Sequence, residues 1–301
     1  YYRDRGCSAL KYGVESGSQK ILDLMEKVFT VDDVDKALSA CIEHNVLTPI
    51  CVMLGMPGED ESTVKKTGQF LGRMASKLGV HQKWISTDIM WALPLPGTPL
   101  WEYGEQLGVI GKKDHDVVDY LTRVSDAGCF RRYYINLNGA PISEVLFWEH
   151  LVLFEASRTF HKLNNVNKKL TKKYREKNMT AKNANPRHSL RYTALTFTAI
   201  TYLIDKYCVG NKLFDSLPRV IVYPIVKYLL YFEYQIQKLF ARNKSNNLFV
   251  YTKKVKRLPR ENINEKSSRK RSLRGYVMKN RRPLNETSDL EKVRDLLRIG
   301  L

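Results

Sequence analysis

The stretch LKYGVESGS (Leu10–Ser18) decides the fold, together with CVMLGMPGED (Cys51–Asp60) and ALPLPGTPLW (Ala92–Trp101). Each stretch runs from a strand-like segment into a turn that is rich in Gly, Pro, Ser or a carboxylate. In parallel α/β sheets the loops at the carboxyl ends of the strands build the ligand site. The three stretches therefore predict an α/β fold with successive parallel strands and one ligand-binding edge.

Hydrophobic periodicity places helices between these strands. Thr30 with Asp33 predicts a capping box, and Asn45 predicts a helix stop because Asn tolerates the left-handed conformation. The apolar stripe of the helix before Thr30 includes Val28 as a buried residue. The predicted order after the first strand is helix 18–28, helix 30–45, strand 46–54, helix 61–78 and strand 84–93.

Three longer segments point to a family: GCSALKYGVESGSQKILDLMEK (6–27), VMLGMPGEDESTVKKT (52–67) and PLPGTPLWEYGEQLGVI (94–110). In order and spacing they resemble the second half of the radical S-adenosylmethionine domain, in the branch that carries a cobalamin-binding domain upstream. The resemblance covers about residues 1–111 and is absent beyond about His150. It implies the carboxyl-terminal half of a partial (β/α)6 barrel, followed by a mainly helical, basic extension.

The resemblance also implies which residues hold the cofactor, S-adenosylmethionine. In the family a carboxylate and a serine after the fourth strand hold its amino-acid and ribose parts, and the ends of the next two strands frame its adenine. By position, these cofactor-binding residues are Glu15, Ser16, Leu54, Gly55, Pro57, Leu93 and Pro94. Taken alone, the carboxylate could be a helix cap and GMPGE a generic turn. The three motifs together favour the ligand site.

The cysteines depart from the family pattern. The family holds a [4Fe–4S] cluster with three thiolates in a CxxxCxxC loop, which leaves one iron free for the cofactor. This chain has five cysteines, and none are so spaced: Cys7, Cys41, Cys51, Cys129 and Cys208. We therefore interpret the chain as a carboxyl-terminal fragment, with the cluster ligands and a cobalamin domain expected upstream of Tyr1, and we assign it no metal ligand.

By resemblance, the parent protein is a radical enzyme in which the reduced cluster cleaves the cofactor to a 5′-deoxyadenosyl radical. The outcome would be cobalamin-dependent methyl transfer or another radical modification of a small molecule. We expect the chain alone to be inactive. Catalytic residues are unassigned, although substrate contacts could fall within 111–141, a stretch that includes Tyr134 and Asn136. The alternative is a non-enzymatic half-barrel that binds a polyanion or a membrane surface.

Charge divides the chain into two unlike halves. Residues 1–150 carry 16 Lys and Arg against 20 Asp and Glu, whereas residues 151–301 carry 34 against 11. The predicted parts are barrel residues 1–111, a flanking helical segment 112–166, a helical extension 167–240 and a basic tail 241–301 with a short terminal helix. A basic tail attracts any polyanion, whatever the sequence of that polyanion. The chain contains no recognisable nucleic-acid-binding motif.

The extension leaves two interpretations open. Its apolar segments 193–204 and 220–240 either pack together or on the barrel, or lie on an anionic membrane surface. Residues 164–188 favour a linker or a solvated helix. Neither apolar segment is long enough to span a bilayer. Few, unpaired cysteines and no signal peptide favour a cytoplasmic protein, peripheral to the membrane where the basic half contacts lipid.

Overall fold

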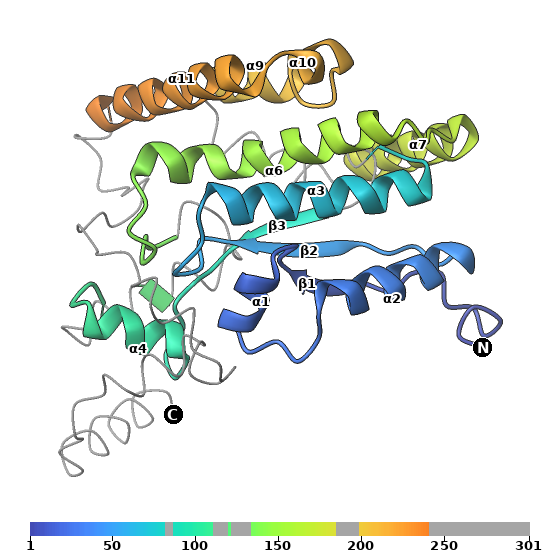
Figure 1. Ribbon diagram of the computed structural model, residues 1–301, viewed down its shortest axis with the longest axis horizontal. Helices are drawn as coiled ribbons and strands as arrows, with labels where there is room; N and C mark the ends of the chain where they lie inside the picture. The colour runs from blue at the N-terminus through green and yellow to red at the C-terminus, as the bar shows by residue number, and fades with distance from the viewer. Residues whose placement is uncertain (82–86, 111–119, 122–133, 185–198, 241–301) are drawn as a thin grey trace.

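Three parallel strands form the centre of the molecule (Figure 1). The computed structural model describes residues 1–81, 87–110, 120–121, 134–184 and 199–240. The strands β1 (Tyr12–Glu15), β2 (Ile50–Leu54) and β3 (Thr87–Trp91) pair in the order β1-β2-β3. Helices flank this sheet, so the predicted parallel α/β fold is confirmed. The described residues do not close a barrel, and a barrel remains a prediction, as does the division into four parts.

Helices build layers on the sheet. In Figure 1, α6 lies alongside α3, and α11 lies on the far side of α6 from the sheet. The helices are α1 (Gln19–Leu24), α2 (Val31–Glu43), α3 (Glu61–Leu78), α4 (Pro99–Gln106), α6 (Ile142–Leu163), α7 (Lys168–Ala184), α9 (Ala199–Tyr207), α10 (Lys212–Ser216) and α11 (Arg219–Phe240).

Local signals set several helix ends as predicted. The Thr30 side chain accepts from the Asp33 amide and Asp33 accepts from the Thr30 amide, which completes the capping box of α2. After that helix, Asn45 takes a left-handed conformation with φ 55°. The expected helix 61–78 forms with those bounds as α3 and ends at Gly79, where φ is 73°. In these cases one residue's side chain or backbone freedom fixes the boundary.

Two predicted elements are too long. Helix α1 ends at Leu24, and Val28 is fully exposed instead of buried, because the chain leaves the helix at Met25 and turns at Glu26 with φ 55°.

The expected strand 46–54 begins only at Ile50. Leu47 makes an isolated bridge to Ala9, and proline at position 49 has no amide to donate to a ladder. Of the strand predicted over 84–93, β3 forms Thr87–Trp91; residues 82–86 lie outside the described ranges.

The two faces of the sheet differ. Val14, Val52 and Trp91 are buried against the helices in the main core. Alternate residues point to the other, more open face, where Cys51 and Met53 are only partly buried. A second apolar cluster, with residues of α1 and α4, lies at the carboxyl end of the strands. Strand β2 is thus buried on one face, whereas the nearly all-apolar stretch 46–54 predicts a strand buried on both faces.

The closest helix contact joins α3 to α6. A Cβ added to Gly68 would lie 2.6 Å from the carbonyl oxygen of Val152, and one added to Gly72 would lie 2.4 Å from that of Ala156. These distances are below any real Cβ contact, so only glycine lets the two backbones approach this closely. Both glycines lie on the same face of α3, four residues apart.

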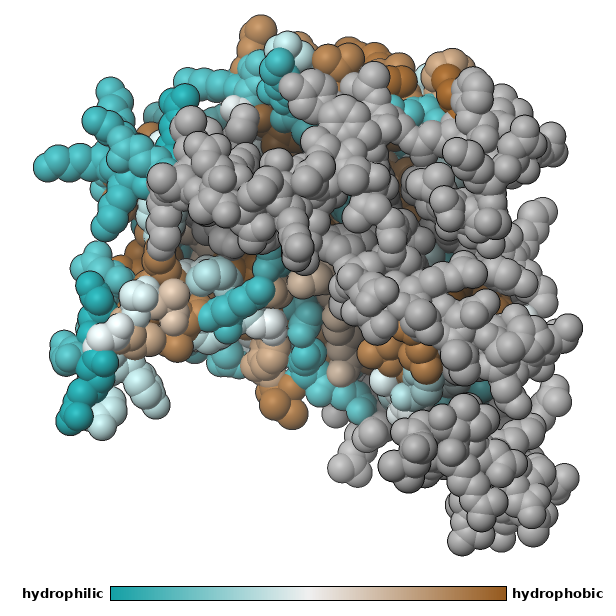
Figure 2. Space-filling model, turned by 180° about the vertical axis from the view of Figure 1, so that it is seen from behind, coloured by the Kyte–Doolittle hydropathy of each residue, from teal (hydrophilic) through white to brown (hydrophobic). Residues whose placement is uncertain are grey.

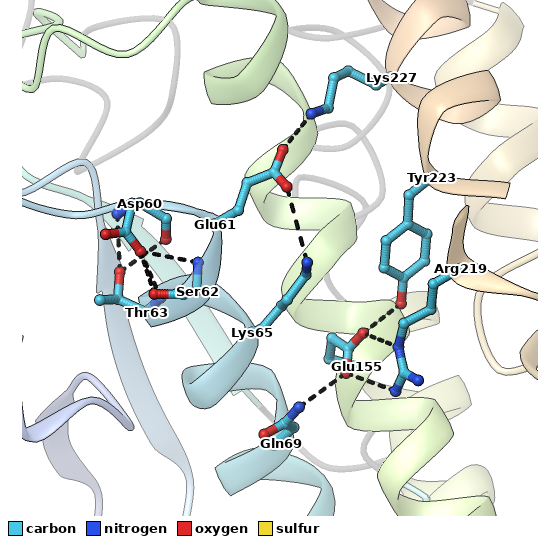
Figure 3. Close-up of polar contacts among 10 residues, drawn as sticks. All are labelled: Asp60, Glu61, Ser62, Thr63, Lys65, Gln69, Glu155, Arg219, Tyr223 and Lys227. Carbon is cyan, nitrogen blue, oxygen red and sulfur yellow. Dashed lines mark hydrogen bonds and ion pairs between the residues drawn. The ribbon is translucent and has the colours of Figure 1, made fainter. Parts of the chain in front are cut away.

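Buried Glu155 on α6 attaches α11 to this pair (Figure 3). Its carboxylate accepts from Arg219 Nε at 2.6 Å, from the Tyr223 hydroxyl at 2.6 Å and from Gln69 Nε2 of α3 at 3.2 Å. Burial alone would raise the pKa of Glu155, but these hydrogen bonds outweigh it and hold that pKa below its usual value. Lys227 of α11 also pairs with Glu61 of α3, as Figure 3 shows.

Helix α11 of the extension packs on α6 and contacts α9, and the membrane-surface interpretation stays untested. Residues 193–198 lie outside the described ranges. Val222, Tyr223, Val226 and Leu230 of α11 belong to the main core. Within 164–188 the structure forms helix α7, and its side chains from Lys168 to Glu176 are exposed or half-buried, as a solvated helix and not a linker would have them. None of the helices in the described ranges is long and apolar enough to cross a membrane, as predicted.

We predict that Gly72→Ala destabilises the protein. In an exposed helix this change would stabilise by up to about 1 kcal/mol. Here the added methyl group meets a backbone carbonyl, which cannot move as a flexible side chain does, so the free energy of unfolding should fall by about 1–3 kcal/mol. Urea unfolding measures the change.

Lys66→Ala, at an exposed position of the same helix, is the matched control and should leave that free energy within about 0.5 kcal/mol of the wild-type value. Equal stability of Gly72→Ala and wild type would show that α3 and α6 do not approach as closely as described.

Candidate functional site

The three strands end at one edge of the sheet. Glu15 pairs with Val52, and Leu54 pairs with Trp91 in the parallel ladder. The Ala92 amide continues the ladder by donating to the Leu54 carbonyl at 2.8 Å. The seven residues predicted to bind the cofactor follow these strand ends, and the structure therefore places all of them at this edge. Their binding role stays a prediction.

Glu15 is held in an unusual backbone conformation. It follows an irregularity in the β1–β2 register and has φ 67°, a left-handed value that is uncommon for a residue other than glycine. A Cβ on Gly13 would lie 3.1 Å from Glu15 Oε1, so the carboxylate lies over Gly13 on the open face. Lys27 Nζ pairs with the same oxygen at 3.1 Å. The edge thus presents a partly exposed pair of opposite charges.

Lys27 was not among the predicted site residues. It reaches Glu15 because α1 is short: the chain turns back after Leu24, and the Lys27 amide donates to the Leu22 carbonyl. The side chains of Lys27 and Glu15 are 31% and 18% exposed. The sequence alone did not place Lys27 at this site, because the expected helix 18–28 would hold its side chain away from the end of the strand.

Ser16 has a different environment from Glu15. It is fully buried, and its hydroxyl lies 3.1 Å from Thr67 Oγ1 and accepts from the Ser18 amide. The Gly17 amide also donates to Thr67 Oγ1. These contacts join the end of β1 to α3. The Ser16 hydroxyl therefore faces α3, where it stabilises the end of β1, and it does not point to the open face of the sheet.

The loop after β2 is fixed by hydrogen bonds to its backbone. The Gly55 amide donates to Glu59 Oε2 at 2.6 Å, and the Gly55 carbonyl accepts from the Tyr134 hydroxyl at 3.0 Å. Asn138 Nδ2 donates to the carbonyls of Met56 at 2.7 Å and Glu59 at 2.8 Å. At Gly55, φ is 90° and a Cβ would lie 2.4 Å from the Tyr134 ring, so only glycine fits.

These contacts revise the expectation for 111–141. Tyr134 is buried, and Asn136 Nδ2 donates to the Ala140 carbonyl at 2.8 Å. Both side chains therefore stabilise the protein around the loop after β2 and are not open to a substrate. Residues 111–119 and 122–133 lie outside the described ranges, so for them the expectation stays a prediction.

Leu54 and Pro57 are buried, Pro94 is buried and Leu93 is half-buried. Among the predicted residues, Glu15 is thus the one whose charged side chain reaches the open face. Leu93 adds part of an apolar side chain to the same edge. The Gly55 amide already bonds to Glu59 and its carbonyl to Tyr134. At this position the loop therefore offers a ligand a fixed surface and not backbone hydrogen bonds.

Glu59 is the buried acid of the site. Only 2% of the residue is exposed, and Oε1 has no hydrogen-bond partner. Burial raises its pKa to about 8, although the hydrogen bond from the Gly55 amide opposes the shift. Below about pH 8 the Glu59 carboxyl is therefore protonated, and its burial beside Gly55 does not require burial of a charge.

A second polar group lies on the open face, further from the edge. Lys11 Nζ pairs with Asp88 Oδ2 at 2.6 Å, and Cys51 Sγ lies 3.7 Å from the same oxygen. The hydrogen bond and charge of Asp88 raise the pKa of Lys11, and burial raises the pKa of the Cys51 thiol. Sequence reasoning missed this cluster because Lys11 precedes β1 while Cys51 and Asp88 lie on β2 and β3, so their proximity depends on strand register.

Ser157, His161 and Asp215 form a third cluster, between α6 and α10. The Ser157 hydroxyl donates to Asp215 Oδ2, which also lies 2.8 Å from His161 Nδ1, and Ser157 Oγ lies 2.9 Å from His81 Nε2. A nucleophilic serine must be accessible to its substrate, whereas Ser157 is fully buried. The cluster therefore serves packing. Among the described residues, no group of three or more His, Cys, Asp or Glu side chains could hold a metal ion.

Comparison with known proteins gives one distant relation. No known family profile matches the chain. A stretch of 101 residues, 34% of the chain, is 29% identical to an uncharacterized methyltransferase of Pyrococcus horikoshii. The chain spans only 20% of that protein's length. The similarity assigns no family to this chain.

We predict that Glu59→Gln changes how stability depends on pH. The folded-state pKa of about 8 lies above the usual 4.5, so the folded protein keeps a proton that the unfolded chain releases between these values. The stabilising contribution of the neutral acid is complete below about pH 4.5 and is lost as the pH rises through about 8. Glutamine cannot ionise and lacks this loss.

Urea unfolding at a series of pH values measures this effect. Relative to Glu59→Gln, the free energy of unfolding of the wild type should fall between about pH 5 and 8, by up to about 1.4 kcal/mol per pH unit. Glu43→Gln, at an exposed carboxylate, should follow the wild-type curve. Parallel curves for Glu59→Gln and wild type would contradict the prediction.

Proposed function

We propose that this chain contributes the S-adenosylmethionine-holding edge of a radical S-adenosylmethionine enzyme that transfers a methyl group to, or otherwise modifies, a small molecule. The observation that carries the proposal is the Glu15–Lys27 pair on the open face at the end of β1. The amino-acid part of the cofactor carries one ammonium and one carboxylate. Glu15 can hold the ammonium group and Lys27 the carboxylate, so the pair matches both charges.

The rest of the edge supports this role. The loop from Gly55 to Glu59 is held by Tyr134 and Asn138 and would give a flat adenine a rigid boundary without ordering cost on binding. Leu93 adds apolar surface beside it. The similarity to an uncharacterized methyltransferase favours S-adenosylmethionine, the common methyl donor, over other ligands.

The iron–sulfur cluster does not fit the described residues. The family's cluster needs three thiolates on one loop, whereas Cys7, Cys41 and Cys51 stand on separate segments and form no ligand group. We therefore propose that cluster ligands, and any cobalamin-binding domain, belong to residues outside these 301. The function proposed for this chain is confined to binding and orienting the methionine-derived cofactor.

We predict that Glu15→Gln and Lys27→Met each weaken binding of S-adenosylmethionine. Each change removes one charge-assisted contact, so the dissociation constant should rise about tenfold or more. Isothermal titration of the 301-residue chain with S-adenosylmethionine measures it. The exposed pair Asp35–Lys77, with Nζ 2.5 Å from Oδ2, gives the matched controls Asp35→Asn and Lys77→Met.

The control variants should bind as the wild type does. No binding by the wild type, or an equal loss in both sets of variants, would refute the assignment of this edge.

A further prediction concerns the cluster. Anaerobic reconstitution of the purified chain with iron and sulfide should give no stoichiometric four-iron species, because the described residues offer no three-thiolate site. Iron and sulfide analysis and the visible absorption spectrum report the result. A stable four-iron cluster on this chain would contradict the proposal that its ligands lie elsewhere.

A further inference from the structure

Helix α11 is apolar on both of its faces. Toward α6 it buries Val222, Val226 and Leu230. On the opposite side, spacings of three and four residues place a second apolar row. This row, the outer α11 face, consists of Val220, Ile221, Ile225, Tyr228, Leu229, Phe232 and Ile236, which are all exposed. A helix that only covers a protein core carries charged or polar side chains on its solvent side, whereas the exposed positions of α11 from Val220 to Ile236 are apolar.

The apolar surface continues beyond α11. Leu203 and Tyr207 of α9, Leu213 of α10 and Leu217 after it are also exposed. Helices α9 and α11 contact each other, and Figure 1 shows α9, α10 and α11 together along one edge of the molecule. In Figure 2 hydrophobic side chains gather along the same upper edge. Contiguous exposed apolar surface of this kind marks an interaction site.

Among the described residues of α9, α10 and α11, the exposed charged side chains are basic, and Asp205 is half-buried beside His150. The one carboxylate of α11, Glu233, is buried and accepts from the Ile200 and Thr201 amides at the start of α9. Exposed Lys206 and Lys212 stand beside the apolar residues. The sequence that follows α11, residues 241–301, contains 18 Lys and Arg against 6 Asp and Glu. The outer α11 face therefore leads directly into a strongly basic sequence.

We propose that the outer α11 face, with the adjoining side chains of α9 and α10, docks on an anionic lipid bilayer surface. A second copy of the chain would cover the apolar row equally well, but the chain carries a formal net charge of +19 and each copy would bring its own basic sequence to the contact. An anionic bilayer instead offers acyl chains against which the apolar row can be buried and negative headgroups that attract the basic residues.

The helix would lie in the plane of the interface. No helix in the described part of the chain can cross a membrane, and the buried side of α11 remains packed on α6. Tyr228, which is 66% exposed, has the amphipathic ring that favours the headgroup level. This inference does not depend on the proposed cofactor edge, which lies on the other side of α3 and α6.

Vesicle co-sedimentation of the 301-residue chain tests the proposal. Vesicles of phosphatidylcholine with phosphatidylglycerol should bind the protein, and pure phosphatidylcholine should bind it more weakly. The double variant Ile225→Glu with Phe232→Glu should lower the partition coefficient about tenfold or more, because two exposed apolar side chains no longer enter the lipid. Raising salt to about 0.5 M should weaken only the ionic part.

The matched control changes the charge equally at exposed apolar sites elsewhere. Val28→Glu with Val166→Glu, on loops before α2 and α7, should bind vesicles as the wild type does apart from a small ionic loss. Circular dichroism and the melting temperature confirm that both double variants fold.

Three results would overturn the proposal: no binding to anionic vesicles, an equal loss in both double variants, or a dimer without vesicle binding that Ile225→Glu with Phe232→Glu dissociates. The last result would identify a second copy as the occupant.

Discussion

The close approach of α3 and α6 is the constraint on which the other layers depend. Gly68 and Gly72 allow the backbone of α3 to touch the carbonyls of Val152 and Ala156. Helix α3 covers the sheet, and α6 in turn carries α10 and α11. At the same contact, Glu155 of α6 collects donors from α3 and α11. A shift of α6 away from α3 would therefore weaken the attachment of α11 and leave a buried carboxylate without its partners.

The same framework makes the edge at the carboxyl ends of the strands rigid. Thr67 of α3 holds Ser16 and Gly17, while Tyr134 and Asn138 hold the loop after β2 from the other side. Glu15, in contrast, is placed by the backbone of β1 itself and keeps its carboxylate partly exposed beside Lys27. The edge thus combines residues satisfied within the protein with one pair of accessible charges. Such a division is what a binding site needs, because the fixed part sets shape and the open part meets the ligand.

Sequence signals predicted the elements that are governed locally. The expected bounds of α3 agree with the structure, in which Asp60 caps its start and Gly79 ends it, and Thr30 caps the start of α2 as the sequence predicts. The signal failed at Val28, where periodicity continued after the chain had left the helix. It also could not give the partners of Gly55: Tyr134 and Asn138 lie about eighty residues further along the chain. Contacts of that kind follow from tertiary packing, which no local pattern encodes.

The acidic and basic halves of the sequence lie in different parts of the structure. The acidic first half contains the sheet edge with Glu15, whereas the basic second half begins within α6 and contains α11. Helices α3 and α6 separate the two, so α11 lies on the side away from the strands (Figure 1). A bilayer against the outer α11 face would therefore leave the carboxyl ends of the strands uncovered. Binding of a soluble cofactor and docking on lipid would then be compatible, because each uses a different side of the α3–α6 pair.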